Sequence, residues 1–584
     1  MAVLRTSNAP IGLDRGKPIS TETNLVGWQA PSDWLTFTVP GSTEQKLIGT
    51  VAIYNQDSNY LAVNMTTTDS SQYNVDWGDG TSANFTSGVT AEKNYLWSDI
   101  SAGTLTSEGY RQAVVTITPT TGGRTFATLL PSRRHSALAA SSSITSPWTN
   151  IAISAPNATT IDFANTGIPC AFAEQVQIVS SNITSGSSLF KSFYAAQNIV
   201  FNTSGTLTTT SSMFQDCRSL RIAPLLNTSS VTNMSSMFQA CYNLQSVPLY
   251  NTVLVTSMSS MFTSCASLTT VPLFNTVAVT NMSNMFTTCR SLQSVPLFNT
   301  AAVTNMSTMF SSCDSLKTCP LFNTALVTDM SSMFFLATSI TTIPLFNTAA
   351  VTNMTNIFFG ADSLQSIPLI DTALVTTMNS GFRFVEPLQS LVLNTPLVTN
   401  VANMLPNTFS LRDLELNLSS VSSLANNNLE IGNASAASAS ASLGRAKLTG
   451  MKWTLTFQNC QMGATQLDEM YTALATLNPA ITTVSGDGTT VTYTVGTADI
   501  KSFIVGRSVT VTAVDPIAYN ISGTVASVNN GAGTFTITNA ATGTYVSGGV
   551  ASITSDRTIT VTGNPGAASD TPSIATNKGW TVVG

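Results

Sequence analysis

The stretch NTVAVTNMSNMFTTCRSLQSVPLF, Asn275 to Phe298, decides the fold of most of this chain. It returns almost unchanged as NTAAVTNMSTMFSSCDSLKTCPLF, Asn299 to Phe322, so one unit begins 24 residues after the last (299 − 275). The same period places Met-Phe pairs at Met213-Phe214, Met237-Phe238, Met261-Phe262, Met285-Phe286, Met309-Phe310 and Met333-Phe334. A short fixed period of this kind indicates stacked structural repeats.

Each unit combines two apolar patterns. One set is spaced by three or four positions: Val231, Met234, Met237, Phe238 and Cys241. This spacing predicts one buried face of a short helix or 3₁₀ segment. The pattern then changes to a period of two at Val247 and Leu249, which predicts a short strand around Pro248. Such a small unit cannot bury its apolar face alone, so neighbouring units must stack into a solenoid with one continuous core.

The repeated sequence resembles the leucine-rich repeat of the BspA-like type, with the signature VTNMSxMFxxCxSLxxVPLxNT. Residues Asn227 to Thr372 match this signature closely, and residues 151–480 follow it more loosely. The resemblance implies a curved solenoid used for recognition, often on surfaces that contact other cells. It implies no catalysis.

Cysteine and aromatic residues recur with the same period. The cysteines are Cys217, Cys241, Cys265, Cys289 and Cys313, and alanine replaces them at Ala337 and Ala361. We interpret them as buried free thiols, with metal binding or disulfides between coils as the alternatives. Cys170, Cys319 and Cys460 lie off this ladder and have the same interpretation.

The aromatic positions Tyr250, Phe274, Phe298, Phe322 and Phe346 are expected to insert into the core. An outward apolar stripe is the alternative. Asn251, Asn275, Asn299, Asn323 and Asn347 follow at one register, where a buried amide could bond the turn backbone of its own and the neighbouring coil.

Variable polar positions flank each predicted strand and are the candidates for a solvent-facing recognition surface. They are Gln245, Thr269, Gln293, Lys317, Thr341 and Gln365.

Ahead of the repeats, residues 33–120 read as short strands between polar turns and predict an antiparallel β-sandwich. YNVDWGDGT, Tyr73 to Thr81, resembles the turn of a polycystic-kidney-disease-type (PKD-type) immunoglobulin-like domain, which implies spacing or adhesion. In such a turn Asp76 and Asp79 cap the local backbone. Residues 1–32 are expected to form an arm, and residues 121–150 a linker that carries His135.

The segment after the repeats is expected to hold a helix, an insertion and a last repeat. TQLDEMYTAL predicts a helix with a capping box at Thr465 and Asp468. Residues 481–556 alternate apolar and polar residues and predict a small β-barrel or sandwich inserted before a closing repeat, residues 557–584. Tyr493 to Gly549 resemble a small β-module of bacteriophage tail and virion proteins, which implies a place in a phage particle.

Composition excludes several functions. Charged residues make up 9% of the 584 residues and the net charge is −6, so no basic surface for nucleic acid is expected. No run approaches the roughly 18–20 apolar residues of a membrane span, and the N-terminal sequence lacks the apolar core of a secretion signal. We therefore expect no membrane insertion and no export by the usual route.

Nothing in the sequence predicts a catalytic, cofactor or metal site. His135 is the only histidine and lies in the predicted linker. We therefore expect neither a Ser-His-Asp or Cys-His catalytic arrangement nor a His-rich metal site. The acid pairs Asp76/Asp79 and Asp468/Glu469 lie in a turn and at a helix start. A glycosidase built on distant carboxylates stays open as a minor alternative.

The sequence thus predicts a multidomain, mainly β, non-enzymatic protein. Our first hypothesis is a virion structural protein of a bacteriophage, exposed on capsid or tail and assembled in the host cytoplasm. Its solenoid would recognise a host protein or glycan, or decorate the particle, and its partners would be other virion proteins and further copies in a homo-oligomer. The alternative is a bacterial cell-surface adhesin.

Overall fold

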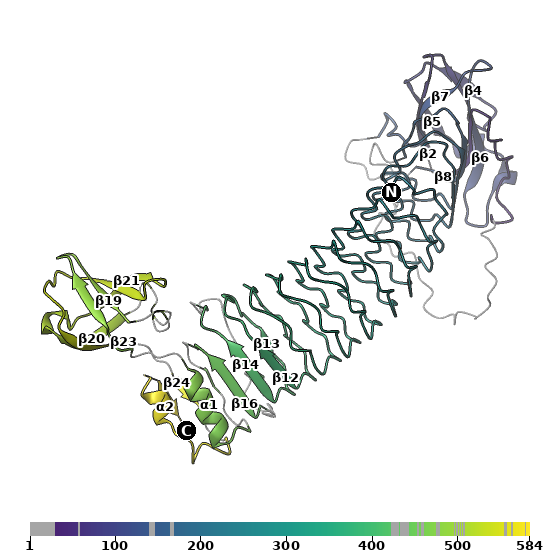
Figure 1. Ribbon diagram of the computed structural model, residues 1–584. Coiled ribbons are helices and arrows are strands. Elements are labelled where there is room, and N and C mark those ends of the chain that lie inside the picture. Colours follow the sequence, from purple (N-terminus) through teal and green to yellow (C-terminus); the bar gives the residue numbers. More distant parts are fainter. Residues whose placement is uncertain are drawn as a thin grey trace. The chain divides into compact units, whose positions relative to one another are not determined.

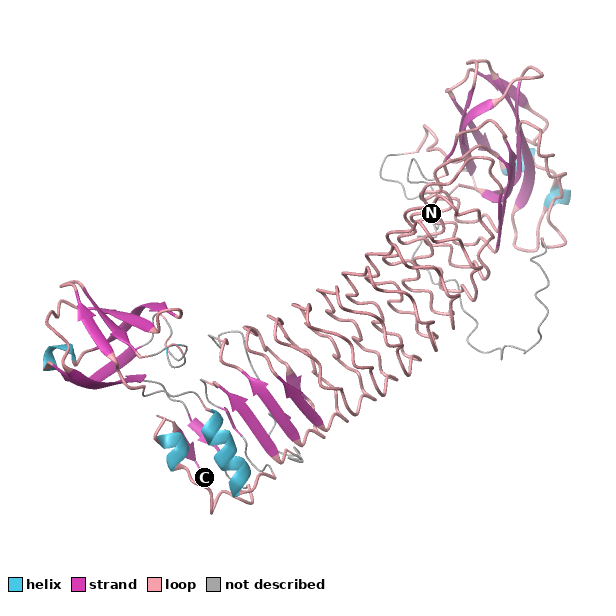
Figure 2. Ribbon diagram, viewed as in Figure 1, coloured by secondary structure: helices cyan, strands magenta, loops and turns pink. Residues whose placement is uncertain are grey.

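The structure is a computed structural model that describes residues 30–56, 59–138, 146–163, 169–421, 431–432, 443–451, 455–456, 461–474, 479–495, 497, 500, 503, 505, 508–553, 558–561, 564–578 and 580–583. The chain divides into two compact units, Met1–Asn299 and Thr300–Gly584. The predicted mainly-β class is confirmed (Figures 1 and 2). The predicted arm, residues 1–32, and Cys460 fall almost wholly outside the described residues.

The first unit begins with two facing sheets whose central strands, such as β1 and β2, are buried along almost their whole length. One has the strand order β5-β2-β7-β9 and the other β11-β10-β8-β1-β6-β3-β4. Their bounds are β1 Lys46–Ile53, β2 Asn59–Thr67, β3 Tyr73–Asp76, β4 Ser82–Phe85, β5 Thr90–Tyr95, β6 Arg111–Pro119, β7 Phe126–Leu130, β8 Trp148–Ser154, β9 Thr160–Ile161, β10 Gln175–Ser180 and β11 Asn198–Phe201. Side chains such as Trp148, Tyr73 and Phe126 fill the core and are fully buried.

The predicted linker, residues 121–150, is wrong. Its strand β7 pairs with β2, and β8 pairs antiparallel with β1. Apolar alternation in both segments explains the pairing, because each strand needs a neighbour for its backbone and a core for Leu129 or Trp148. The other edge of β8 pairs in parallel with β10, and β10 with β11. One sheet therefore runs from the sandwich into the first coils of the repeats.

The predicted helical segment of each repeat is a chain of turns instead. Ser236 and Ala240 have φ of 55° and 61°, and the equivalent residues of other coils are also left-handed. A left-handed residue at every fourth position interrupts a helix. The amides then alternate: Met237 N–H donates to Met234 within the coil, whereas Phe238 N–H donates to Met261 of the next coil. The turns thereby make a lateral ladder (Figure 1).

The second unit continues the turn ladder and ends in regular strands. β12 Ser390–Leu393, β14 Asp413–Asn417 and β16 Arg445–Thr449 pair in parallel, as do β13 Leu405–Pro406 and β15 Ile431–Gly432. Helix α1 (Ala464–Ala473) follows with Gly463 as its N-cap. Thr465 therefore lies inside the helix and does not cap it. Asp468 instead accepts hydrogen bonds from Thr571, at 2.6 Å from its amide nitrogen.

The last strands are split by an inserted domain. β17 (Leu455–Thr456) pairs in parallel with β24 (Thr558–Thr560), which pairs with β25 (Thr581–Val583); α2 spans Ser573–Thr576. Between β17 and β24 lies a sheet of β18 Thr483–Gly486, β19 Thr490–Thr494, β22 Thr534–Thr538, β21 Ser522–Asn529, β20 Ser508–Asp515 and β23 Ser547–Ile553. Ile481 N–H donates to Gly549 across the open side at 2.9 Å. This bond closes the sheet into a small barrel around Tyr493, Tyr519 and Phe535.

Candidate recognition surface

The inner side of each coil is an apolar ladder without any reactive group. Phe214, Phe238 and Phe262 stack with centroids 5.4 and 5.8 Å apart and ring planes within 6° of parallel. Phe310 and Phe334 repeat this stack in the second unit at 5.8 Å. Tyr250, Phe274, Phe298, Phe322 and Phe346 are 2–4% exposed, so the core interpretation of the aromatic positions is confirmed and the outward stripe is wrong.

The seven cysteines that the structure describes are buried and free, as predicted. Cys241 Sγ donates to the Phe214 carbonyl at 3.0 Å, one coil back. Burial raises the pKa of Cys289 to about 12. A thiol held protonated in this way is a poor nucleophile and a poor metal ligand. Among the described residues, no group of three His, Cys, Asp or Glu side chains is arranged for a metal ion.

A threonine ladder, which sequence analysis did not single out, ties neighbouring coils together. Thr252 Oγ1 donates to the Asn275 carbonyl at 2.7 Å and Thr324 Oγ1 to the Asn347 carbonyl at 2.8 Å. Both threonines are at most 1% exposed. The asparagine side chains are exposed, so the predicted buried amide is wrong. Their Oδ1 atoms accept from their own turn, as from Val253 N–H to Asn251 at 3.2 Å.

No strand forms around Pro248, and four of the proline-containing coils make a tight turn at this position instead. Phe274 N–H donates to the Pro272 carbonyl at 3.0 Å and Phe346 N–H to Pro344 at 2.9 Å. A bond between residues two apart is a γ-turn centred on the intervening leucine. Proline removes the ladder donor, and no strand is assigned anywhere from residue 202 to residue 389, all of which are described.

The γ-turns hold leucine side chains out in solvent. Val247 is buried as predicted, but Leu249 is 65% exposed rather than buried with it. The exposed leucines are Leu225, Leu249, Leu273 and Leu297 in the first unit and Leu321, Leu345 and Leu369 in the second, all 60–76% exposed. One exposed leucine is ordinary, but an apolar residue at one register of successive coils makes a patch.

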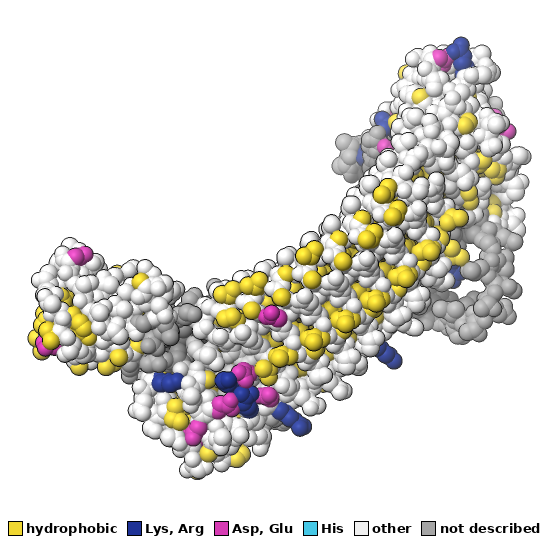
Figure 3. Space-filling view, in the orientation of Figure 1, with side chains coloured by type: hydrophobic (Ala, Val, Ile, Leu, Met, Phe, Trp, Pro, Cys, Tyr) yellow, Lys and Arg dark blue, Asp and Glu magenta, His cyan; other side chains and the backbone are white. Residues whose placement is uncertain are grey.

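A second apolar row lies on the same face. Along a coil, Leu249, Asn251 and Val253 are exposed while Tyr250 and Thr252 between them are buried. Val253 lies in the turn that follows Asn251, and its amide donates to Asn251 Oδ1. Figure 3 shows hydrophobic side chains in rows along the repeats, nearly free of charged groups. We call this surface of the first unit the leucine–asparagine face: Leu225, Asn227, Leu249, Asn251, Val253, Leu273, Asn275, Val277 and Leu297.

The predicted polar positions lie beside these leucines, four residues earlier in each coil. Gln245, Thr269, Gln293, Lys317, Thr341 and Gln365 are all exposed. Their backbones join the ladder, since Gln293 N–H donates to Thr269 at 3.0 Å and Thr341 N–H to Lys317 at 3.2 Å. The structure thus brings them into one row in each unit, bordering an apolar row that sequence analysis missed. A proline followed by an apolar residue at a fixed register was the available signal.

Other candidates are structural. Asp76 and Asp79 accept from the amides of Gly78 and Thr81 at 3.0 Å, so the predicted capping role is confirmed. Burial opposes ionisation of Asp79, but hydrogen bonds from Lys93 and Thr81 still leave its pKa lowered. The His135 ring packs against Tyr60 at a tilt of 39°, with ring centroids 4.5 Å apart.

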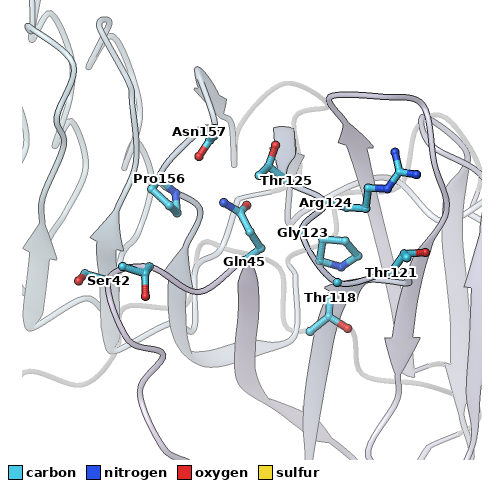
Figure 4. Close-up of a pocket in the computed structure, with 12 residues that line it drawn as sticks. Ser42, Gln45, Thr118, Thr121, Gly123, Arg124, Thr125, Pro156 and Asn157 are labelled. Carbon is cyan, nitrogen blue, oxygen red and sulfur yellow. The ribbon is translucent and has the colours of Figure 1, made fainter.

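An open hollow of about 470 Å³ in the first unit is lined by residues that include Gln45, Thr125 and Asn157 (Figure 4). Gln45 Oε1 accepts from Phe126 N–H at 2.9 Å, and Arg124 pairs with Asp69. Its main polar groups therefore already have partners, which makes the hollow a weak candidate site.

The charged residues of the second unit concentrate on β14, β16 and α1. Arg445 bonds Asp413 at 2.8 Å and Glu469 at 2.7 Å, and Lys447 bonds Glu415 at 2.7 Å. The hydrogen bond from Arg445 lowers the pKa of Glu469, and that from Lys447 lowers the pKa of Glu415. These paired charges fix the parallel register and leave no carboxylate free for acid–base chemistry in the network.

No helix in the described part of the chain is long and apolar enough to span a membrane.

The repeat region matches a family model described as "Mycoplasma protein of unknown function, DUF285". Five overlapping matches cover residues 184–295, 208–321, 269–366, 292–395 and 319–442, together less than half of the chain. The search of curated protein sequences found no match.

Leucine-rich-repeat proteins are among the solved structures similar to this chain. A TLR13–ssRNA13 complex matches at 15% identity over 56% of this chain and 45% of the other, with a TM-score of 0.23. A leucine-rich-repeat protein of Leptospira interrogans matches at 12% identity over 52% and 84%, with a TM-score of 0.19. Toll of Drosophila, in complex with Spatzle, matches at 13% identity over 53% and 48%, with a TM-score of 0.17. This chain thus spans less than half of the first of these proteins.

Proposed function

We propose that this chain is a non-enzymatic structural protein of a bacteriophage particle whose BspA-like leucine-rich-repeat solenoid contacts another macromolecule. The 24-residue solenoid is the scaffold, the sandwich is a PKD-type immunoglobulin-like cap, and the barrel is a virion-type β-module. The observation that carries the binding role is the row of leucines that directly follow the prolines of successive coils, each 60–76% exposed.

The physical argument is one of cost. Leaving a leucine in water forfeits about 1.5–3 kcal/mol that its full burial would contribute. The strand coils carry charged side chains, Glu415 and Lys447, at the equivalent outward position, whereas the proline coils carry leucine there. Such a surface is favourable once a partner covers it, and the bordering amide and hydroxyl side chains, such as Gln245 and Gln293, add hydrogen-bonding specificity.

The place in a virion rests on a sequence resemblance, carried by residues 493–549. A bacterial cell-surface adhesin is the second candidate, and one observation favours it: the family model that matches residues 184–442 is described for Mycoplasma, a cellular organism. Both candidates use the same contact surface, and they differ in where the protein is found.

Mass spectrometry of purified particles, with antibody labelling of the repeats in electron micrographs, tests the location. We expect the chain in particles, at a tail tip, a fibre or regularly over the capsid. Its absence from particles together with labelling of the bacterial envelope would overturn the virion proposal in favour of the adhesin.

A matched pair of variants tests the contact surface. Leu273→Ser changes a γ-turn leucine that is 61% exposed, and Leu105→Ser changes a leucine of the sandwich that is 52% exposed. We expect the first substitution to weaken attachment of the chain to particles or cells and the second to leave it unchanged. Equal behaviour of the two variants would contradict the proposed surface.

A further inference from the structure

We propose that Tyr242 and Arg221, in the first unit, bind a sugar that carries a carboxylate, the chemistry shared by sialic and uronic acids. Tyr242 stacks on one face of the sugar ring, and Arg221 pairs with the carboxylate. Neither residue belongs to the leucine–asparagine face. The site therefore goes beyond the contact surface of the proposed function and gives the repeats a second, chemically distinct means of recognition.

An arginine holds the Tyr242 ring in place. Tyr194, Arg218 and Tyr242 occupy one register of three successive coils, whose backbones bond each other beside these residues. The guanidinium carbon of Arg218 lies over both rings, 4.3 Å from the centroid of Tyr194 and 5.8 Å from that of Tyr242. Guanidinium groups stack on aromatic faces in this way, and Asp216 holds Arg218 through an ion pair of 3.3 Å. One face of the Tyr242 ring is therefore turned towards Arg218.

No large side chain covers the other face of the Tyr242 ring from the same register. The next coil has Ala266 there, and Tyr242 is 43% exposed. Coil stacking requires no ring at this register, since Thr338 holds it in the second unit. The electron-rich face of an aromatic ring attracts the weakly positive C–H groups on the apolar side of a sugar ring. Tyr242 is thus a fixed, open platform for such a ligand.

The polar side chains beside Tyr242 indicate the kind of sugar. Asn243 and Gln245 are exposed and offer amides to sugar hydroxyls. Arg221 is also exposed and lies one coil back, where its carbonyl accepts from Gln245 N–H at 2.8 Å. Among the described residues, the Arg221 guanidinium has no ion pair and no hydrogen bond. The site therefore has one uncompensated positive charge, and a guanidinium binds a carboxylate through two parallel hydrogen bonds.

Two other classes of ligand fit this arrangement less well. A single-stranded nucleic acid is held by several stacking rings and a basic groove along its backbone. The described residues of this row offer one exposed ring, and the chain has a net charge of −6. A protein partner is held by apolar anchors in desolvated pockets, whereas amides and an arginine surround Tyr242.

Isothermal titration calorimetry of the purified full chain with two matched pairs of sugars tests the ligand class. Sialyllactose is compared with lactose, and glucuronosyl-glucose with cellobiose, so each pair sets a carboxylated sugar against its neutral counterpart. We expect at least one acidic sugar to bind about tenfold or more tightly than its counterpart, and the pair that responds distinguishes sialic from uronic acid. Equal binding within both pairs, or no binding of any sugar, overturns the inference.

Variants test the two roles separately. Tyr242→Ala should weaken binding of the acidic sugar by about tenfold or more, as for loss of a stacking ring. Tyr54→Ala is its control, because Tyr54 is 37% exposed in the same unit. Arg221→Gln should remove the preference for the acidic sugar, whereas Arg412→Gln, at the same register of a coil in the second unit, should retain it.

The opposite results overturn the inference. Wild-type binding by Tyr242→Ala, or an unchanged preference in Arg221→Gln, removes the assigned contact. A single-stranded oligonucleotide is the further probe. If it binds and requires Tyr242 while the sugars do not bind, the site is a nucleic-acid platform instead. Thermal unfolding of each variant, followed by circular dichroism, excludes misfolding as the cause.

The sugar site and the proposed function can fail separately. If an acidic sugar binds at Tyr242 but Leu273→Ser leaves attachment to particles or cells unchanged, the leucine surface fails and the sugar site stands. If Leu273→Ser weakens attachment and no acidic sugar binds, only the sugar site fails.

Discussion

Two kinds of coil in the second unit share one core and differ on the outside. In the coil of Leu364, Ser366-Ile367-Pro368-Leu369-Ile370 forms no strand and leaves Leu369 74% exposed. In the next coil, Ser390-Leu391-Val392-Leu393 replaces Pro-Leu with one valine and forms strand β12. The difference teaches that a proline and one extra residue replace a regular strand by an irregular segment that presents leucine to solvent.

The strand coils use their outward positions differently. Glu415 of β14 and Lys447 of β16 pair in register at the position that Val392 holds in β12. Their side chains form ion pairs, whereas the proline coils carry apolar and amide groups. The ladder of buried leucines runs through both kinds of coil, and the phenylalanine stack extends as far as Phe382. We conclude that the core specifies stacking and that the outward residues specify what each coil contacts.

The largest expected effect on the free energy of unfolding distinguishes a buried leucine of a strand coil from an exposed leucine of a proline coil. Leu391→Ala removes a fully buried side chain and should lower the free energy of unfolding by about 2–5 kcal/mol. Leu345→Ala, at a side chain that is 60% exposed, should change it by less than about 0.5 kcal/mol. Chemical denaturation followed by circular dichroism measures both. Similar losses would mean that Leu345 packs in the core.

The threonine ladder should matter equally in both kinds of coil. Thr324→Val and Thr395→Val each delete a buried hydroxyl that donates to a carbonyl of the next coil, at 2.8 and 2.6 Å. An unsatisfied buried carbonyl costs about 1–3 kcal/mol, and we expect both losses to lie in this range. Thr328→Val, at an exposed hydroxyl, is the control. If the control costs as much as the buried positions, the ladder has no special role.

Much of the core could be predicted from the sequence because its spacing is repeated. The Met, Phe and Cys positions keep the same kind of side chain from repeat to repeat, which identifies them as core positions. Where Cys is replaced, another small residue takes its place, which identifies a position with little space. The protruding leucines were missed although Pro-Leu recurs at a fixed register, because an apolar residue at a period of two, as in Val247 and Leu249, is also the mark of a buried strand residue. In the structure the leucine side chain points to solvent instead of into the core, and this follows from the backbone conformation after the proline.

The missed sandwich strands have a similar cause. Residues 121–150 are rich in Ser, Thr and Gly, so β7 and β8 are short apolar runs among polar residues. Their partners β2 and β1 lie far away in sequence, and pairing between such distant segments leaves no local signal. The helical prediction for the repeats failed because a period of three or four does not show that Ser236 and Ala240 are left-handed.

Converting a proline coil into a strand coil should raise the free energy of unfolding, by less than the two preceding substitutions lower it. Replacing Pro368 by valine and deleting Leu369 turns that coil into the sequence pattern of β12. We expect one or two new ladder hydrogen bonds, each worth about 1 kcal/mol. Hydrogen exchange of residues 366–370 should slow in the altered chain, while exchange in the sandwich stays the same. Unchanged exchange would show that the proline does not control strand formation.

The smallest expected effect concerns the charged strand coils. The pKa values of Glu415 and Glu469 are lowered in the folded chain, so their ion pairs contribute stability above the unfolded value of about 4.3. The contribution is lost as pH falls through the folded pKa values. Arg445→Met should therefore cost about 1 kcal/mol or less near neutral pH and nothing once these carboxylates are protonated. Denaturation curves across this pH range measure it, and a pH-independent cost would contradict the ion-pair account.

The account stands or falls on whether the γ-turn leucines touch another macromolecule. The most direct measurement places a photoreactive diazirine amino acid at position 273, with the same residue at position 105 as control, and irradiates the protein in its native assembly. We predict a covalent adduct from position 273 and none from position 105, and mass spectrometry of the adduct identifies the partner. The absence of any adduct at 273, or equal adducts at both positions, would contradict the claim that the repeats present a contact surface.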